Sequence, residues 1–294
     1  MAGNNNLKRN EVESWKETNI WDQIDQSVHD EVNRIRVAAK VFMPRPMDNA
    51  ISVPVDAVDI KDLTINENTI PFVEISQSFS LTDTQIEKEV VLGTAVILAR
   101  MAAKSVAMAE EIILFGGRES PVPLPPGINI QRRESARQGL LGLAAQARQV
   151  VPPEGNPPGI FGEANFDAVS DGINRLVAQG QPGPYALFLS PPRYADSHRS
   201  LTPTLVTAAD RMKPLLPGGF HATVGLPANR GLLVSLGGEA TSLVVSQDTI
   251  TGFTQQDDHL SRFRVFERIQ FVVRDPRALL RLEFQGIDPI VEPD

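Results

Sequence analysis

The sequence predicts an α+β protein in which helices dominate the first half and strands the second. Three observations predict this class. Apolar residues recur at helical spacing over residues 20–38, helix formers run without proline from Thr84 to Leu114, and short apolar or alternating segments follow one another after residue 184. With 294 residues, 41% of them apolar, the chain is long enough for one large core or two smaller ones.

The first helix is predicted by a stripe of apolar residues. Trp21, Ile24, Val28, Val32 and Ile35 recur every three or four positions, while Asp, Gln, Glu and Asn occupy the opposite face. An amphipathic helix over residues 20–38 follows from this pattern. Such a stripe usually faces a core, but it can also form one wall of a groove for a partner peptide.

The next segment predicts an exposed pair of strands. Between residues 51 and 65 apolar residues alternate with Asp and Lys, and a turn is expected at residues 66–68. The pair is either a decorated loop or an arm that reaches a neighbouring chain. Residues 71–81 then predict a strand that leads into the long helix.

The long helix is the clearest local prediction. Thr84 and Glu87 fit a capping box, and Gly116 with Gly117 is expected to end the helix. Residues 95–109 are almost entirely apolar, which is typical of a central helix on which other elements pack. The sequence therefore predicts one continuous helix from Thr84 to Leu114.

The second half alternates loops, one helix and several strands. Residues 120–158 are rich in Pro, Arg and Gly, so they predict a long loop, with a short helix near residues 135–149. A helix capped by Asn165 is expected at residues 166–179, followed by a buried strand at residues 185–189. Further strands are predicted at residues 221–226, 231–236, 243–245, 262–273 and 278–284.

Composition and end segments restrict the function. The formal net charge of −8 opposes the wrapping of nucleic acid, and the absence of cysteine excludes a disulfide, a thiolate metal site and a cysteine nucleophile. The N-terminus is polar, and no stretch approaches the about 20 apolar residues of a membrane span. We expect a cytoplasmic protein that binds neither nucleic acid nor membrane.

The sequence contains no catalytic motif that we recognise. It has no G-x-S-x-G, no H-E-x-x-H and no glycine-rich phosphate loop, and its four histidines are scattered. Asp257, Asp258 and His259 form the best metal candidate, but adjacent side chains on an extended chain point to opposite sides, so a solvated hairpin loop is favoured. We expect no catalytic residue, no metal site and no cofactor.

Three arginines alternate along one face of a predicted strand. Arg262, Arg264 and Arg268 could bind phosphate, although Glu267 interrupts them. Because the chain is acidic overall, a subunit contact or a solvated face is the favoured interpretation.

Seven short segments, in order, resemble the encapsulin shell proteins, a family once labelled as linocin-type bacteriocins. The resemblance spans residues 15–284; the insertion after residue 117 and residues 285–294 depart from the family pattern. The segments are W-x-x-I-D at 21–25, P-x-x-E at 71–75, Glu111–Gly116, G-L-L at 139–141, G-P-Y at 183–185, Q-D-x-x-x-G-aromatic at 247–253 and the closing strand at 275–284.

The resemblance implies the fold of tailed-bacteriophage major capsid proteins, the Hong Kong 97-type fold. An arm without its own core makes sense if a neighbouring subunit completes it. The implied parts are an N-terminal arm and helix at 1–48, an extended arm (E-loop) at 49–76, a peripheral domain with the long helix and the insertion at 77–155, an axial domain at 156–250, and return strands with a tail at 251–294.

The resemblance also implies a function. Such chains self-assemble into icosahedral encapsulin nanocompartments and enclose a cargo enzyme, often a dye-decolourising peroxidase or a ferritin-like protein, recruited by a short C-terminal peptide. Iron storage or protection against oxidative stress then depends on the cargo, and the shell itself is no enzyme. Some members bind a flavin through a Trp before the long helix, but Thr84 and its neighbours stand there, so we expect no flavin.

Site residues follow from the resemblance by position. The implied peptide groove lies beside the N-terminal helix, with Val28, Val32 and Ile35 in one wall and Ile250 opposite. The implied pores lie at symmetry axes and are lined by the loop at 200–213, including Asp210 and Arg211.

Two functions from other classes stay open. A prophage major capsid protein has the same fold and packages DNA, although the acidic charge and the Q-D-x-x-x-G-aromatic segment favour an encapsulin. A hydrolytic enzyme would require a nucleophile and a base, for which the sequence offers no recognised motif.

Overall fold

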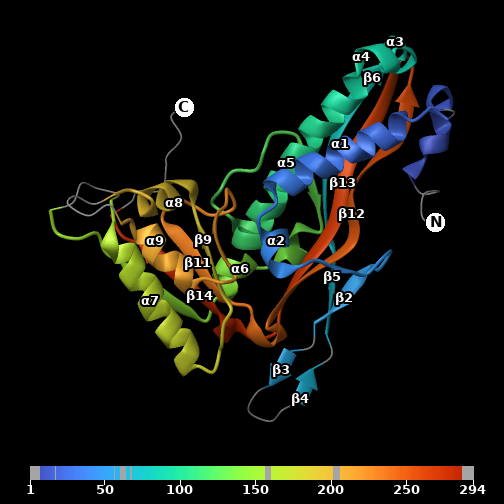
Figure 1. Cartoon of the computed structure of the whole chain (residues 1–294). Helices are drawn as coiled ribbons and strands as arrows, with labels where there is room; N and C mark the ends of the chain where they lie inside the picture. The colour runs from blue at the N-terminus through green and yellow to red at the C-terminus, as the bar shows by residue number, and fades with distance from the viewer. Residues whose placement is uncertain are drawn as a thin grey trace.

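The computed structural model contains two five-stranded sheets and an arm that projects from the first sheet (Figure 1). The structure describes residues 7–16, 18–55, 57–59, 64–66, 68–155, 160–200 and 206–286.

The first sheet is built around a long antiparallel hairpin. Along β13 the buried Phe263 and Val265 alternate with the more exposed Arg262 and Arg264, so one face of the strand is apolar and the other charged. The strand order is β1 (Arg45–Pro46), β12 (Thr241–Asp257), β13 (Leu260–Val273), β6 (Val73–Thr82) and β7 (Ile128–Gln131).

Two helices lie side by side over one face of this sheet, as Figure 1 shows: α1 (Ile20–Ile35) and α5 (Thr94–Gly116). The stripe of α1 faces inward, and a short helix, α2 (Ala38–Phe42), follows it. The N-terminal segment joins the same core, because Trp15 stacks on Phe263 with ring centroids 5.4 Å apart. The predicted amphipathic helix is confirmed, and its stripe belongs to the core.

The predicted long helix is divided into three: α3 (Asp83–Glu87), α4 (Glu89–Leu92) and α5. Because β6 extends to Thr82, the capping box is made by Thr82 and Gln85, so the prediction of Thr84 as the cap was wrong. Gly93 adopts a left-handed conformation with φ of 60° between α4 and α5. The buried carboxylate of Glu89 accepts hydrogen bonds from the first N–H groups of α5, which stabilises the new start.

The second sheet separates two layers of apolar side chains. In β9, Leu187 faces the core beneath α7, whereas Phe188 faces the first core and contacts Phe115 at the end of α5, with ring centroids 5.0 Å apart. Burial on both faces explains the unbroken apolar sequence of the predicted strand. The order is β10 (Gly219–Ala222), β9 (Tyr185–Leu189), β11 (Arg230–Ser235), β14 (Leu279–Phe284) and β8 (Gln146–Val150), with helices α7 (Glu163–Ala178), α8 (Pro191–Ser197) and α9 (Ala208–Met212).

The insertion contains more regular structure than the sequence predicts. Within the predicted helix at 135–149, only Gly139–Leu143 (α6) is α-helical, because residues 146–150 pair with β14 as strand β8. Gly117 and Gly139 contact each other closely: a Cβ on Gly117 would lie 2.4 Å from the nitrogen of Gly139. This contact ties the G-L-L segment to the end of α5.

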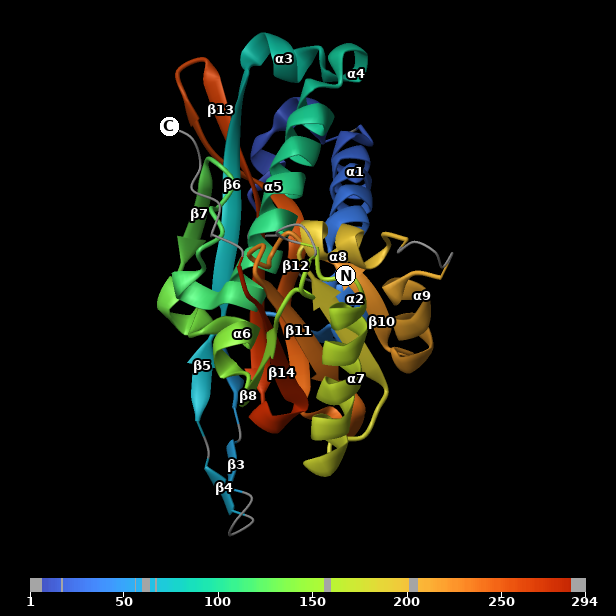
Figure 2. The ribbon, with the colours of Figure 1, turned by 90° about the vertical axis from the view of Figure 1, so that its left-hand side faces the viewer.

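The arm consists of two short two-stranded sheets, β2 (Ser52–Pro54) with β5 (Thr69–Pro71) and β3 (Ala57–Asp59) with β4 (Thr64–Asn66). It points away from the body at the end opposite α3 and α4 (Figure 2). The predicted strand pair is confirmed. The domain ranges stay a prediction, and their boundaries at residues 76 and 250 fall inside the continuous strands β6 and β12.

Candidate functional site

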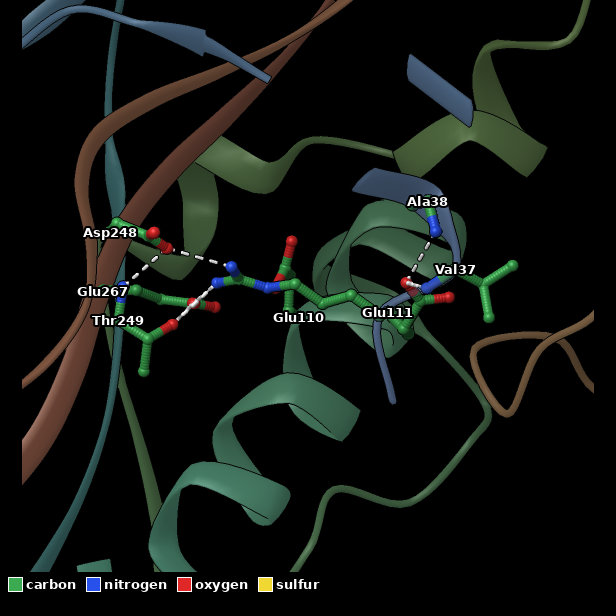
Figure 3. Close-up of polar contacts among 8 residues, drawn as sticks. Val37, Ala38, Glu110, Glu111, Asp248, Thr249 and Glu267 are labelled. Carbon is green, nitrogen blue, oxygen red and sulfur yellow. Dashed lines mark hydrogen bonds and ion pairs between the residues drawn. The ribbon is translucent and has the colours of Figure 1, made fainter. Parts of the chain in front are cut away.

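A polar cluster occupies the junction between α1, α2, α5 and the long hairpin (Figure 3). We call it the junction cluster; it consists of Arg36, Glu110, Asp248, Thr249 and Glu267. Arg36 directly follows α1, and its extended backbone (φ −56°, ψ 126°) ends the helix. The side chain is thereby free to enter the space between α5 and the sheet.

The guanidinium of Arg36 binds side chains from three elements. It forms ion pairs with Glu110 of α5 and Glu267 of β13. It also donates to Asp248 at 2.9 Å and to the hydroxyl of Thr249 at 2.7 Å, both on β12. The Thr249 hydroxyl in turn donates to Glu267 at 2.6 Å. One cation therefore joins a helix to both strands of the hairpin.

The neighbouring Glu111 holds the start of α2. One of its oxygens accepts hydrogen bonds from the N–H groups of Val37 and Ala38, each at 2.9 Å, and the other accepts from the Thr223 hydroxyl at 2.6 Å. A carboxylate at the first turn of a helix satisfies N–H groups that have no partner within the helix. Glu110 and Glu111 thus fix the two sides of the turn between α1 and α2.

A β-bulge delivers Asp248 and Thr249 to Arg36. The register of β12 against β13 shifts between Val245 and Gln247 and again between Gln247 and Ile250. An irregularity of this kind re-aims side chains that would otherwise follow the pleat. The Q-D-x-x-x-G-aromatic segment coincides with this bulge, and Phe253 at its end lies in the core 5.5 Å from Phe263.

Burial and mutual charge shift the pKa values of the cluster. Burial raises the pKa of Glu267 to about 8, and the negative charge of Glu110 adds to this more than Arg36 opposes it. Burial likewise raises the pKa of Glu110 and of Glu111. Burial opposes the charge of Arg36 too, but the surrounding carboxylates outweigh it and raise the pKa of the guanidinium.

A pocket of about 570 Å³ opens beside the cluster; we call it the junction pocket. Its walls combine apolar groups with both signs of charge, so it suits a mixed apolar and polar ligand. The lining residues are Asn33, Arg36, Ala39, Lys40, Pro44, Pro46, Asp48, Glu110, Leu243, Val245 and Asp248.

The structure corrects part of the predicted groove. Val28 and Val32 are 0% and 2% exposed, because the stripe of α1 packs on the core, so neither can contact a peptide in this conformation. Ile35 and Ile250 are partly buried. In the sequence they directly adjoin two residues of the junction cluster, Arg36 and Thr249. They stay predictions.

The predicted pore residues lie on α9, away from the junction cluster in the fold. Both are exposed. Asp210 completes a capping box with Thr207, and these hydrogen bonds lower its pKa. Arg211 pairs with Glu163 and lies over the ring of Phe166, 3.8 Å from the centroid. Their place at a pore stays a prediction.

The other candidate residues have local partners. Asp257 ends β12, Asp258 lies in the hairpin turn, and the exposed His259 pairs with Asp83 at 3.1 Å, so these residues form the expected hairpin loop. No group of three or more His, Asp or Glu in the described ranges could hold a metal ion. Among the arginines, Arg264 and Arg268 both pair with Glu74, at 2.9 and 2.7 Å, and Arg262 pairs with Asp257.

Sequence reasoning missed the junction cluster. A signal was present, because Glu110 and Glu111 interrupt an otherwise apolar helix and Glu267 interrupts a row of arginines. Charged residues at buried positions require partners, and that rule points to a polar site. In the described part of the chain no helix is long and apolar enough to cross a membrane.

The arrangement of sheets, long hairpin and arm is that of proteins that form capsids. A virus-like particle from Pyrococcus furiosus matches with a TM-score of 0.68 and 18% identity over 90% of this chain and 99% of the other. A chain of the capsid of Myoviridae phage XM1 matches with a TM-score of 0.53 and 12% identity, over 81% of this chain and 87% of the other. The fold is therefore the Hong Kong 97-type capsid fold, and the predicted α+β class is confirmed.

Sequence comparisons narrow the class of protein within this fold. A family model described as "Encapsulating protein for peroxidase" (Linocin_M18) matches residues 134–270. The type 1 encapsulin shell protein EncA of Myxococcus xanthus is 31% identical over 153 residues, 51% of this chain and 52% of the relative, so the match spans about half the length of that relative. A diheme-cytochrome–encapsulin shell fusion protein of Kuenenia stuttgartiensis is 24% identical over 90% of this chain and 72% of its own. The chain is therefore similar to encapsulin shell proteins over most of its length, which supports the resemblance seen in the sequence.

Proposed function

We propose that this chain is a structural shell subunit that self-assembles into a closed icosahedral compartment in the bacterial cytoplasm and encloses a cargo enzyme. Similarity to encapsulin shell proteins supports the proposal. The shell itself catalyses nothing in this account, and the chemistry belongs to the cargo.

The arm is the observation that carries the proposal. The hairpin of β3 and β4 pairs with no other described strand, and a two-stranded hairpin alone is marginally stable in water. A neighbouring subunit would supply the missing contacts, and closed symmetry would repeat the same contact around the shell.

Cargo recruitment by a short C-terminal peptide is the second part of the proposal. The junction pocket, of about 570 Å³, is large enough for several side chains. Ile35 and Ile250, which adjoin Arg36 and Thr249 in the sequence, are retained as proposed apolar contacts. Many copies of a weak site on one inner surface would load cargo by avidity. A peroxidase or a ferritin-like protein is the proposed cargo, because the family description names peroxidase and the resemblance implies both.

The recruitment proposal is tested by coexpressing the chain with a fluorescent protein that carries the C-terminal tail of a candidate peroxidase or ferritin-like protein. We expect fluorescence to copurify with the chain. Ile250→Asp should abolish copurification, whereas Val177→Asp, at an exposed position on α7, should preserve it. Equal loading of both variants would contradict the assigned groove.

Pores are the third part of the proposal. Asp210 and Arg211, both exposed on α9, are proposed to line a pore for small solutes at a symmetry axis. Charge reversal of Arg211 to Glu should change the rate at which an ionic quencher reaches a fluorescent cargo, and an unchanged rate would contradict the assignment.

A prophage capsid that packages DNA is the alternative, because a phage capsid chain shares the fold. The net charge of −8 favours the compartment over a DNA container. Nuclease-treated particles that still contain long DNA would favour the alternative, and particles that contain protein alone would favour the compartment.

A further inference from the structure

The junction cluster contains more buried carboxylates than buried cations. Glu110 and Glu267 are 1% and 0% exposed, and both pair with Arg36, which is itself 7% exposed. Asp248 adds a third carboxylate at the solvent side. If every group were ionised, the cluster would hold one positive and three negative charges.

Among the residues that the structure describes, no second cation enters this space. Across the strand pair, the residue of β6 that pairs with Glu267 is the apolar Ile75. Glu111 on α5 accepts hydrogen bonds from Val37 and Ala38. Lys40 is exposed and lines the pocket, as does Asp48. The titratable and charged groups around the buried pair are therefore Arg36, Glu111 and Asp248 directly, with His29, Lys40 and Asp48 toward the solvent.

We propose that Glu110 and Glu267 form a proton-binding site, in which the two carboxyl groups share one proton at neutral pH and release it in mildly alkaline solution. Two desolvated carboxylates beside a single guanidinium cannot both ionise without a large unfavourable free energy. One oxygen of Glu267, Oε1, is buried without a hydrogen-bond partner, and it offers the proton a place.

The pKa of Glu110 is raised and that of Glu267 is raised to about 8, which agrees with this geometry. Because the two groups are coupled, the proton belongs to the pair.

Proton release would act on the junction pocket directly. Glu110, Arg36 and Asp248 line the pocket, so loss of the proton adds a negative charge to its wall and leaves Arg36 facing three carboxylates. The same arginine fixes the turn between α1 and α2 and the bulge of β12. The site therefore couples the pH of the surrounding solution to the shape and charge of this pocket. The proposal does not depend on shell assembly.

Infrared spectroscopy of the purified full chain tests the proposal, because a protonated carboxyl group has a C=O absorption distinct from that of a carboxylate. We expect a protonated-carboxyl band at pH 7 that is lost by pH 9. Glu267→Gln and Glu110→Gln should each remove this band at pH 7, since one remaining glutamate is neutralised by Arg36. Glu74→Gln is the matched control, because Glu74 is buried on the same sheet but pairs with two arginines; the band should persist in it.

A wild-type chain without a protonated carboxyl band at pH 7, or a band that persists unchanged in both Gln variants, would overturn the proposal. If neither Gln variant folds, the wild-type titration decides: a band lost between pH 7 and pH 9 supports the site, and a band unchanged to pH 9 overturns it.

Discussion

Arg36 joins segments that lie far apart in the chain. Its partners Glu110 and Glu267 are 74 and 231 residues away in sequence. A buried ion pair contributes little net stability compared with an apolar replacement of the whole pair, but removing one partner leaves uncompensated charge in the interior. Loss of this arginine should therefore strongly lower the stability of the fold.

Arg36→Met should destabilise the folded chain by about 3–5 kcal/mol, because Glu110 and Glu267 lose their cation while remaining buried. Urea unfolding at pH 7 measures the change. The matched control is Arg118→Met, whose exposed pair with Glu119 should contribute less than about 1 kcal/mol. Equal effects of the two substitutions would contradict the role of Arg36.

The stability of the chain should fall as the pH rises from about 5 to 8. The folded pKa of Glu267, about 8, lies above its usual value of 4.5, so its contribution is fully present below 4.5 and is lost as the pH rises through 8. Unfolding free energies measured across this range should show a slope in the wild type that is smaller in Glu267→Gln. Parallel pH profiles for the two chains would argue against a protonated Glu267.

At the scale of single residues the sequence predicted little of the site. The misplaced charges at 110, 111 and 267 were visible, but their partner could be found only once the topology had brought the end of α1 onto α5 and β13. Val28 and Val32 show a different kind of error. Their positions in the family pattern predicted the wall of a groove, whereas both side chains pack in the core.

Among the elements, the α3–α4–α5 series shows how one glycine changes a helix. Gly93 adopts a φ of 60°, and no atom lies within 4 Å of the Cβ that a larger residue would add. The left-handed conformation is therefore the main obstacle to a substitution, and not the available space.

Gly93→Ala should destabilise the chain by about 1 kcal/mol, because alanine enters the left-handed region at that cost. Gly93→Asn should cost less, since asparagine tolerates this conformation. Thermal unfolding of the two variants in parallel checks the difference. A stabilising effect of alanine would mean that the helices merge into one, as the sequence alone predicts.

Local patterns predicted most elements and missed those set by distant partners. Periodicity and turn residues predict the helix at 20–38, the strand at 185–189 and the hairpin around residue 258. The structure confirms all three, although the helix ends at Ile35. The strand β8 was missed because its pairing with β14 joins residues 146–150 to residues 280–284, and no local pattern encodes a parallel contact of that range.

For the whole molecule, the projecting arm bears on assembly more directly than any pocket does. The two sheets share cores within the chain, whereas β3 and β4 project from the body and, among the described strands, pair with each other alone (Figure 2). Sequence alone predicted the strand pair, and the ordered family motifs predicted the capsid fold that the comparisons confirm.

Replacement of residues 57–66 by a short glycine–serine linker should leave a folded chain that does not form shells, because the projecting hairpin would no longer reach a neighbour. Circular dichroism and thermal unfolding check the fold, and light scattering checks the size. The matched control is a linker of the same composition in place of residues 152–155, which lie in the loop after β8. Shells of normal size without the arm would contradict its proposed role.

The most direct measurement is electron microscopy of the full chain, expressed alone and purified at a concentration at which circular dichroism shows it to be folded. The proposal predicts uniform, closed, hollow particles of icosahedral symmetry that contain no DNA. Folded monomers or small oligomers under the same conditions would contradict it.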